Sequence, residues 1–154
     1  MPTFSGNRAA FTPSTTSSNW VLEADTAGDA GKIVAIGWGG ELTTSTAYRT
    51  RWVRATTAGV GAGTALAEEA HTPGYATPLI SLYSAYATTQ EVLPSAPDAL
   101  HLQSWNAHGG LGYIALPLAS PWMVLNGVLT GTISCRNLAG VDANGSSYSV
   151  TWSE

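Results

Sequence analysis

The residue types that carry most enzyme chemistry are few in this chain. Its three histidines are His71, His101 and His108, and its single cysteine is Cys135. Zinc sites use Cys and His ligands at short, regular spacings, and these positions match none of them. A single cysteine cannot form a disulfide within the chain, so we expect Cys135 to be a small apolar side chain in a strand.

Motifs for nucleophilic catalysis and phosphate binding are also absent from the sequence, which contains no GxSxG, GxxxxGK[ST], GxGxxG or CxxC pattern. His108-Gly109-Gly110 is similar to the oxyanion-hole loop of some esterases, but no nucleophile elbow accompanies it. Glu68 and Glu69 are adjacent, and neighbours on a short helix do not face each other. A carboxylate pair across a cleft, as in glycosidases, is not visible in a sequence. We therefore predict a non-enzyme with no catalytic residue, no metal and no cofactor.

Arginine is concentrated in one stretch, AYRTRWVRATT at 47–57, although the chain has only six Lys and Arg residues. Read as a strand, this stretch places Trp52 on the core face, and Arg49 with Arg51 on the opposite face. Two neighbouring guanidinium groups repel each other unless an acid faces them. Either the chain's own carboxylates supply that acid, or Arg49, Arg51 and Arg54 contact carboxylates of a partner protein. The cluster is too small for a DNA-binding patch.

The six tryptophans are the second group of candidate binding residues. Three of them lie within alternating runs, where strand side chains normally face a core. The other three, Trp38, Trp105 and Trp122, lie at predicted strand ends, where an indole can stack on a sugar or anchor a protein interface. We add these three to the arginines as a hypothetical partner interface. The alternative position for each of them is the rim of the core.

The elements that must position these residues are strands. Short alternating runs are separated by Gly, Pro, Asn and Asp, and no segment keeps helical periodicity; the best helical candidate, 64–71, is too short to stand alone. We expect the runs 129–135 and 146–152 to form a hairpin around Asn144-Gly145, with Trp152 on the apolar face. Further strands are expected at 19–24, 32–38, 47–56, 79–87, 100–105, 112–116 and 121–125. About nine short strands pack best as two sheets, so we predict an all-β fold, a two-sheet β-sandwich that is jelly-roll-like.

The length of 154 residues suits one domain. Residues 1–18 are polar and rich in Ser and Thr, so we expect them to be an extended N-terminal arm ordered by a partner, with 19–154 as a single β-sandwich domain. The first residues lack the apolar region of a secretory signal. Prolines interrupt the apolar stretch 111–129, so we expect no membrane helix.

The surface must be poor in charge, because only 10% of the residues are charged, where soluble domains typically carry about 25%. The net charge of −4 argues against direct binding to nucleic acid. A weakly charged surface repels other proteins weakly and is typical of proteins that are buried against a partner. We therefore expect a homo-oligomer.

Most of the chain resembles small structural proteins of tailed-phage virions, including the cement or decoration proteins of phage heads. The resemblance rests on MPTFSGNR at the start, on RWVRATTAGVGAGTALAEEAHTPGYATPLISLYSAYA at 51–87, on HLQSWNAHGGLGYIALP at 101–117, and on TGTISCRN and SSYSVTW near the end. It implies a sandwich or jelly-roll body that forms a homotrimer on the capsid surface and braces the major capsid protein shell. It also implies synthesis in a host cytoplasm and no cofactor.

A carbohydrate- or receptor-binding tail component is the alternative function. In that interpretation Trp38, Trp105 and Trp122 form a platform on which sugars stack. Saturable sugar binding that is lost when these tryptophans are replaced would favour it.

Overall fold

The computed structural model describes residues 2–25, 29–57, 59–61, 63–71, 73–75, 77–94, 100–116, 124–126 and 132–154, and all of its regular elements are strands. In chain order the strands are β1 (Thr3–Phe11), β2 (Trp20–Ala24), β3 (Ala30–Glu41), β4 (Ala47–Arg54), β5 (Glu68–Ala70), β6 (Ile80–Tyr83), β7 (His101–Asn106), β8 (His108–Ala115), β9 (Val124–Asn126), β10 (Ile133–Ala139) and β11 (Ser146–Ser153). The prediction of an all-β chain is confirmed.

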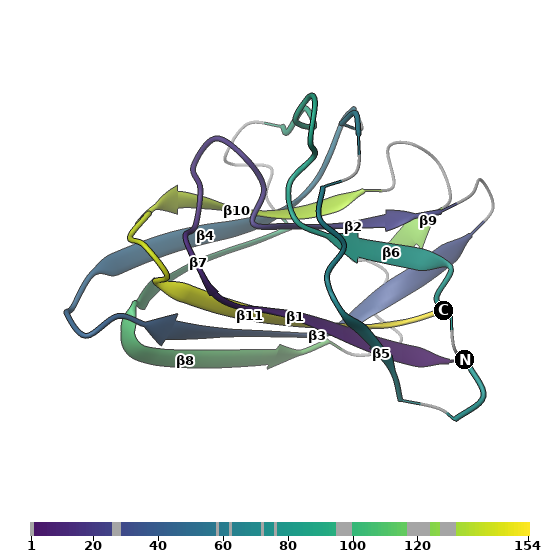
Figure 1. Cartoon of the computed structure of the whole chain (residues 1–154), viewed down its shortest axis with the longest axis horizontal. Coiled ribbons are helices and arrows are strands. Elements are labelled where there is room, and N and C mark those ends of the chain that lie inside the picture. The colour runs from purple at the N-terminus through teal and green to yellow at the C-terminus, as the bar shows by residue number, and fades with distance from the viewer. Residues whose placement is uncertain are drawn as a thin grey trace.

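The strands form two antiparallel sheets that pack face to face (Figure 1). Sheet A has the order β5-β1-β11-β3-β8, and β9 pairs with the beginning of β3. Sheet B has the order β6-β2-β10-β4-β7. Successive long strands switch sheets: β1 and β2, β3 and β4, β7 and β8, and β10 and β11 each divide between A and B. This order is that of a jelly-roll β-sandwich, as the sequence predicts.

The predicted C-terminal hairpin is wrong. β10 pairs with β2 and β4 in sheet B, whereas β11 pairs with β1 and β3 in sheet A. The connection does contain left-handed residues, Gly140 at φ 84° and Asn144 at φ 53°, but it carries the chain from one sheet to the other. Alternation had correctly placed Tyr148, Val150 and Trp152 on the buried face. It could not identify the strands on either side.

The predicted N-terminal arm is also wrong over Thr3–Phe11, because these residues form β1, between β5 and β11. Phe4 is buried and its ring stacks on Trp152 at 5.9 Å between ring centres. Its neighbours Ser5 and Asn7 point outward, so the strand is polar on average although every second residue faces the core. The segment 64–71, the best helical candidate in the sequence, contains the strand β5 at Glu68–Ala70.

The core lies between the sheets and is rich in aromatic side chains. Trp20, Trp52 and Trp152 are buried in it from β2, β4 and β11. Cys135 of β10 is fully buried as well, and burial raises the pKa of its thiol. The prediction that Cys135 is a small apolar side chain in a strand is confirmed.

Candidate functional site

The arginines predicted for a partner interface lie in different environments. Trp52 faces the core, as expected, so the two faces of β4 were assigned correctly. Arg49 is exposed, whereas Arg51 is only 9% exposed and donates from Nη1 to the Pro94 carbonyl at 3.2 Å. Arg54 is half-buried, and burial lowers its pKa. The three side chains therefore do not form one exposed patch.

Glu91, a carboxylate of the same chain, interacts electrostatically with Arg51. Glu91 is 4% exposed and its Oε1 lies 3.3 Å from Nη2 of Arg136, the residue opposite Arg51 on the neighbouring strand. Burial lowers the pKa of Arg51, the positive charge of Arg136 lowers it further, and the charge of Glu91 raises it. Ser18 also donates to Glu91. We call Arg51, Arg136 and Glu91 the buried charge cluster; it matches the intramolecular alternative that the sequence left open.

Two of the three candidate tryptophans point inward. The Trp38 ring lies 5.8 Å from that of Trp52, and Trp105 donates from Nε1 to the Thr50 hydroxyl at 3.1 Å while its ring meets the edge of Tyr48. Both are half-buried at the margin of the core. Trp122 lies outside the described residues. Trp38 and Trp105 thus occupy the core-rim alternative rather than an exposed stacking platform, because the ring of each contacts an aromatic ring of the facing sheet.

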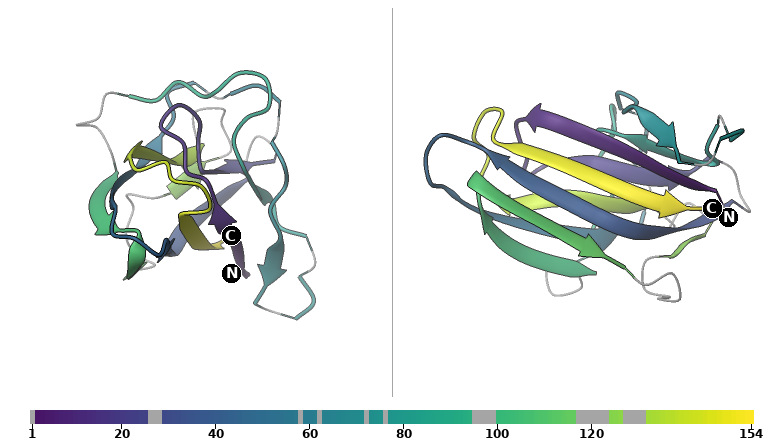
Figure 2. Two further views of the ribbon diagram at one scale, coloured as in Figure 1. Left: turned by 60° about the vertical axis from the view of Figure 1, so that its left-hand side comes forward. Right: turned by 90° about the horizontal axis from the view of Figure 1, so that it is seen from below.

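A shallow groove of about 400 Å³ crosses the outer face of sheet A. The four strands that line it, β1, β11, β3 and β8, lie side by side in the right-hand view of Figure 2. The register sets Ser149 opposite Gly37, which in turn is opposite Tyr113, and the next outward row on the same strands runs from Ser147 through Gly39 to Leu111. We call this feature the sheet A groove; it is lined by Asn7, Arg8, Ala9, Gly37, Trp38, Gly39, Leu111, Gly112, Tyr113, Ser147, Tyr148 and Ser149.

Small residues keep the floor of the sheet A groove flat. A Cβ atom on Gly37 would lie 2.4 Å from the Ser149 hydroxyl, so a side chain there would displace that serine. The wall is formed by Leu111 and Tyr113, which are 87% and 69% exposed. These two residues were not among those predicted from the sequence, although the alternation of Leu111, Tyr113 and Ala115 around Gly112 was a usable signal. Such a surface can bind an apolar or hydroxyl-bearing partner.

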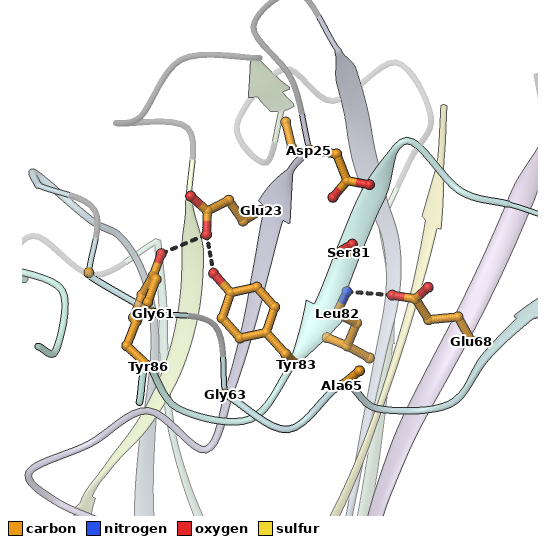
Figure 3. Close-up of a pocket in the computed structure, with 12 residues that line it drawn as sticks. Glu23, Asp25, Gly61, Gly63, Ala65, Glu68, Ser81, Leu82, Tyr83 and Tyr86 are labelled. Carbon is orange, nitrogen blue, oxygen red and sulfur yellow. Dashed lines mark hydrogen bonds between the residues drawn. The ribbon is translucent and has the colours of Figure 1, made fainter. Parts of the chain in front are cut away.

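An acidic pocket of about 440 Å³ lies along β2 and β6, with one lining residue from β5 (Figure 3). Its lining includes the carboxylates of Glu23, Asp25 and Glu68 and has no basic side chain. Glu23 Oε2 accepts hydrogen bonds from the hydroxyls of Tyr83 and Tyr86, the latter at 2.9 Å. Burial raises the pKa of both tyrosines. Glu23 therefore already has two donors within the chain.

Glu68 enters the same pocket from β5 and accepts from the backbone N–H of Leu82 (Figure 3). Burial raises the pKa of Glu68, and the charges of Asp25 and Glu154 add to that shift, while the hydrogen bond from Leu82 opposes it. This is the kind of carboxylate arrangement that sequence spacing cannot show. Among the residues that the structure describes, no group of three or more His, Cys, Asp or Glu could hold a metal ion.

The three histidines lie apart. His71 Nε2 is 2.8 Å from the Ser5 hydroxyl, His108 Nδ1 is 2.9 Å from the Leu42 carbonyl, and the His101 ring packs on Trp52. Within the described ranges, no helix is long and apolar enough to cross a membrane. No protein-family model matches this chain, and no curated protein matches it at a significant level. The sheet A groove is therefore the candidate functional site on its geometry alone.

Proposed function

We propose that this protein is a structural component of a tailed-phage virion, and that it acts as a cement or decoration protein that binds the major capsid protein. The virion class rests on the sequence resemblance described above. Jelly rolls occur among viral capsid domains and also among lectins. A fold by itself does not identify a function, so the binding role is argued from the surface.

The observation that carries the binding role is the open glycine and serine floor of the sheet A groove beside an exposed apolar wall. Leu111 and Tyr113 project from β8 over glycine and serine positions of β3 and β11. Contiguous apolar groups at a surface mark interaction sites, and small floor residues allow another chain to approach closely. Modest affinity per copy is sufficient on a capsid, because a symmetric lattice repeats each contact many times.

The test fills the groove without changing the fold. Ser149 is exposed at the centre of β11, so Ser149→Arg places a long charged side chain on the groove floor. Thr44→Arg adds the same side chain at an exposed position in the loop between β3 and β4 and serves as the matched control. The measurement is the copy number of each variant that sediments with capsids of the phage that encodes the chain.

We expect the unchanged protein and Thr44→Arg to bind to saturation, and Ser149→Arg to lose most of its occupancy. Bound protein should also raise the temperature at which the capsids rupture. Failure of the unchanged protein to sediment with capsids would contradict the cement role. Equal occupancy of both variants would leave that role standing and would contradict its assignment to the sheet A groove.

A carbohydrate- or receptor-binding tail component is the second candidate, and one observation favours it. The Tyr113 ring is 69% exposed beside the hydroxyls of Ser147 and Ser149, and an aromatic face with adjacent polar groups suits a sugar ring. In this candidate function the sugar would stack on Tyr113 instead of on the inward-pointing tryptophans. Saturable binding on a glycan array that Tyr113→Ala abolishes would favour this candidate over the capsid role.

A further inference from the structure

We propose that β8 is a self-association edge, at which two copies of this chain pair antiparallel with Gly112 of one copy opposite Gly112 of the other. The inference goes beyond the proposed function, because it concerns the free protein and requires no capsid. It rests on the position of β8, on the direction of its backbone groups, and on its lack of charge.

β8 is the last strand of sheet A, and among the described residues no strand pairs with it on the side away from β3. The right-hand view of Figure 2 shows it at the margin of the four long strands. The opposite edge strand of sheet A, β5, is protected: it has only three residues, and two of them are Glu68 and Glu69.

The ladder between β3 and β8 determines which backbone groups of β8 point outward. Leu116 N–H donates to the Val34 carbonyl at 2.7 Å, and the register places these two residues directly opposite each other. Hydrogen-bonded pairs alternate along an antiparallel ladder, so Gly112 and Ile114 turn their N–H and C=O groups toward β3. The backbone groups of Leu111 and Tyr113 therefore point away from the sheet, at the edge.

From Leu111 to Ala115, where the ladder with β3 is regular, this edge lacks the usual protection against pairing with another chain; the register shifts only between His108 and Leu111. Natural proteins protect exposed edges with Lys, Pro, inward charges or very short strands. β8 has eight residues, HGGLGYIA, with no Pro and no Lys, Arg, Asp or Glu. The sequence on both sides also lacks Lys, Arg, Asp and Glu, and the nearest of these residues are Asp98 before β8 and Arg136 after it. Two copies can therefore meet here without repulsion between like charges.

The strand is complementary to itself about Gly112. In that register Leu111 of each copy lies opposite Tyr113 of the other, so the outward N–H and C=O groups of these residues bond reciprocally and each ring packs on an aliphatic side chain. The fold itself requires glycine at 112, because a Cβ atom there would lie 2.0 Å from the Trp38 ring of the same chain. The absence of a side chain also leaves the axis free for the second copy. A self-complementary edge closes at two copies, whereas the trimer implied by the resemblance would need a different surface.

The experiment is sedimentation equilibrium of the purified full chain, with hydrogen exchange as a second readout. We expect a concentration-dependent dimer, twice the 15.9 kDa chain mass. The amides of Leu111 and Tyr113 should exchange slowly in the dimer and faster after dilution. Tyr113→Lys and Leu111→Lys, which alter exposed side chains, should each raise the dimer dissociation constant at least about tenfold.

Val141→Lys is the matched control, since Val141 is 51% exposed in the loop between β10 and β11 and should leave the dimer intact. Thermal melts establish that all three variants fold. A protein that stays monomeric at high concentration would overturn the inference, as would a dimer or trimer that both β8 variants leave intact. The capsid-binding test of the proposed function is a separate experiment. A protein that stays monomeric but still sediments with capsids would reject this inference and leave the proposed function standing.

Discussion

The two outer faces of the sandwich differ in what covers them. On sheet B the outward residues include Val21, Val53 and Tyr83, all buried. Residues 55–57, 59–61 and 63–65 together with 84–94 lie over this part of the sheet, joined by bridges between Thr57 and Val92 and between Val60 and Thr89. Val21, Tyr83 and Tyr86 form a second, small core beneath them.

On sheet A the outward positions at the centre are Gly37, Gly39, Ser147 and Ser149, which have little apolar surface to bury. The described residues place no second layer over them. Large outward side chains thus require a cover from the chain itself, whereas small ones leave a face open for another molecule. The exposed Leu111 and Tyr113 are the exception on the open face, which is why we assign binding there.

Removing an aromatic ring from the shared core should have the largest effect, because it damages both sheets. Trp152→Ala is expected to lower the free energy of unfolding by about 3–5 kcal/mol, since the indole is fully buried and stacked on Phe4. Urea unfolding would measure this loss. A melt unchanged by Trp152→Ala would mean that the inner face of β11 is assigned incorrectly.

Disrupting the covered face should have the next largest effect. Glu91→Gln leaves the buried Arg51 and the partly buried Arg136 without a negative charge, and we expect a loss of about 3 kcal/mol in the free energy of unfolding. Arg49 is the exposed arginine of β4, the strand that also carries Arg51, and Arg49→Ser should change the free energy of unfolding by less than about 0.5 kcal/mol. Comparable losses in the two variants would mean that the buried charge cluster does not hold the cover in place.

Changing the open face should barely affect folding. Leu111→Ser and Tyr113→Ser remove side chains that are mostly exposed, so each should change the unfolding free energy of the monomer by less than about 0.5 kcal/mol. Unfolding at protein concentrations below the dimer dissociation constant separates this from any effect on pairing. A loss of several kcal/mol would show that the wall of the groove is part of the core.

The acidic pocket should give the smallest effect, and one that depends on pH. Burial raises the pKa of Glu68 above its unfolded value, so the folded chain holds that proton more tightly. The contribution of Glu68 to stability is therefore present below the unfolded pKa and is lost as the pH rises through the folded pKa. Glu68→Gln keeps an acceptor for Leu82 N–H without the charge. Its free energy of unfolding should therefore be slightly higher than that of the unchanged protein at neutral pH and equal to it in acid.

Glu69→Gln is the control for removing one charge from β5, because Glu69 is exposed. Unfolding of both variants at acidic and neutral pH would test the sign of the effect. Destabilisation by Glu68→Gln at neutral pH would show that the ionised carboxylate is favoured in the fold.

The sequence could predict much of the architecture because alternation reports burial directly. Tyr148, Val150 and Trp152 were placed on the correct face of β11, and the jelly-roll class was predicted. Alternation does not report pairing partners, so β10 and β11 were wrongly joined in one sheet. Average polarity concealed β1, where Phe4 and Phe11 face the core between polar neighbours.

The candidate site was less predictable, because a strand end can face inward or outward. Trp38 and Trp105 were assigned from position in the sequence, and only the facing sheet shows that both indoles are directed into the core. Arg51 was placed correctly on the outer face of β4, yet its cover comes from Glu91 and Pro94, distant in sequence. Interactions between distant segments decide such cases, and spacing does not encode them.

The central claim is that the open face of sheet A is the one that binds a partner. Hydroxyl-radical labelling tests it most directly, with the protein on capsids compared with free protein kept below the dimer dissociation constant, because Tyr113 and Tyr75 are both exposed in the single chain, at 69% and 51%. We predict that capsid binding strongly reduces labelling of Tyr113 and leaves that of Tyr75 unchanged. Unchanged labelling of Tyr113 on fully occupied capsids would contradict the claim.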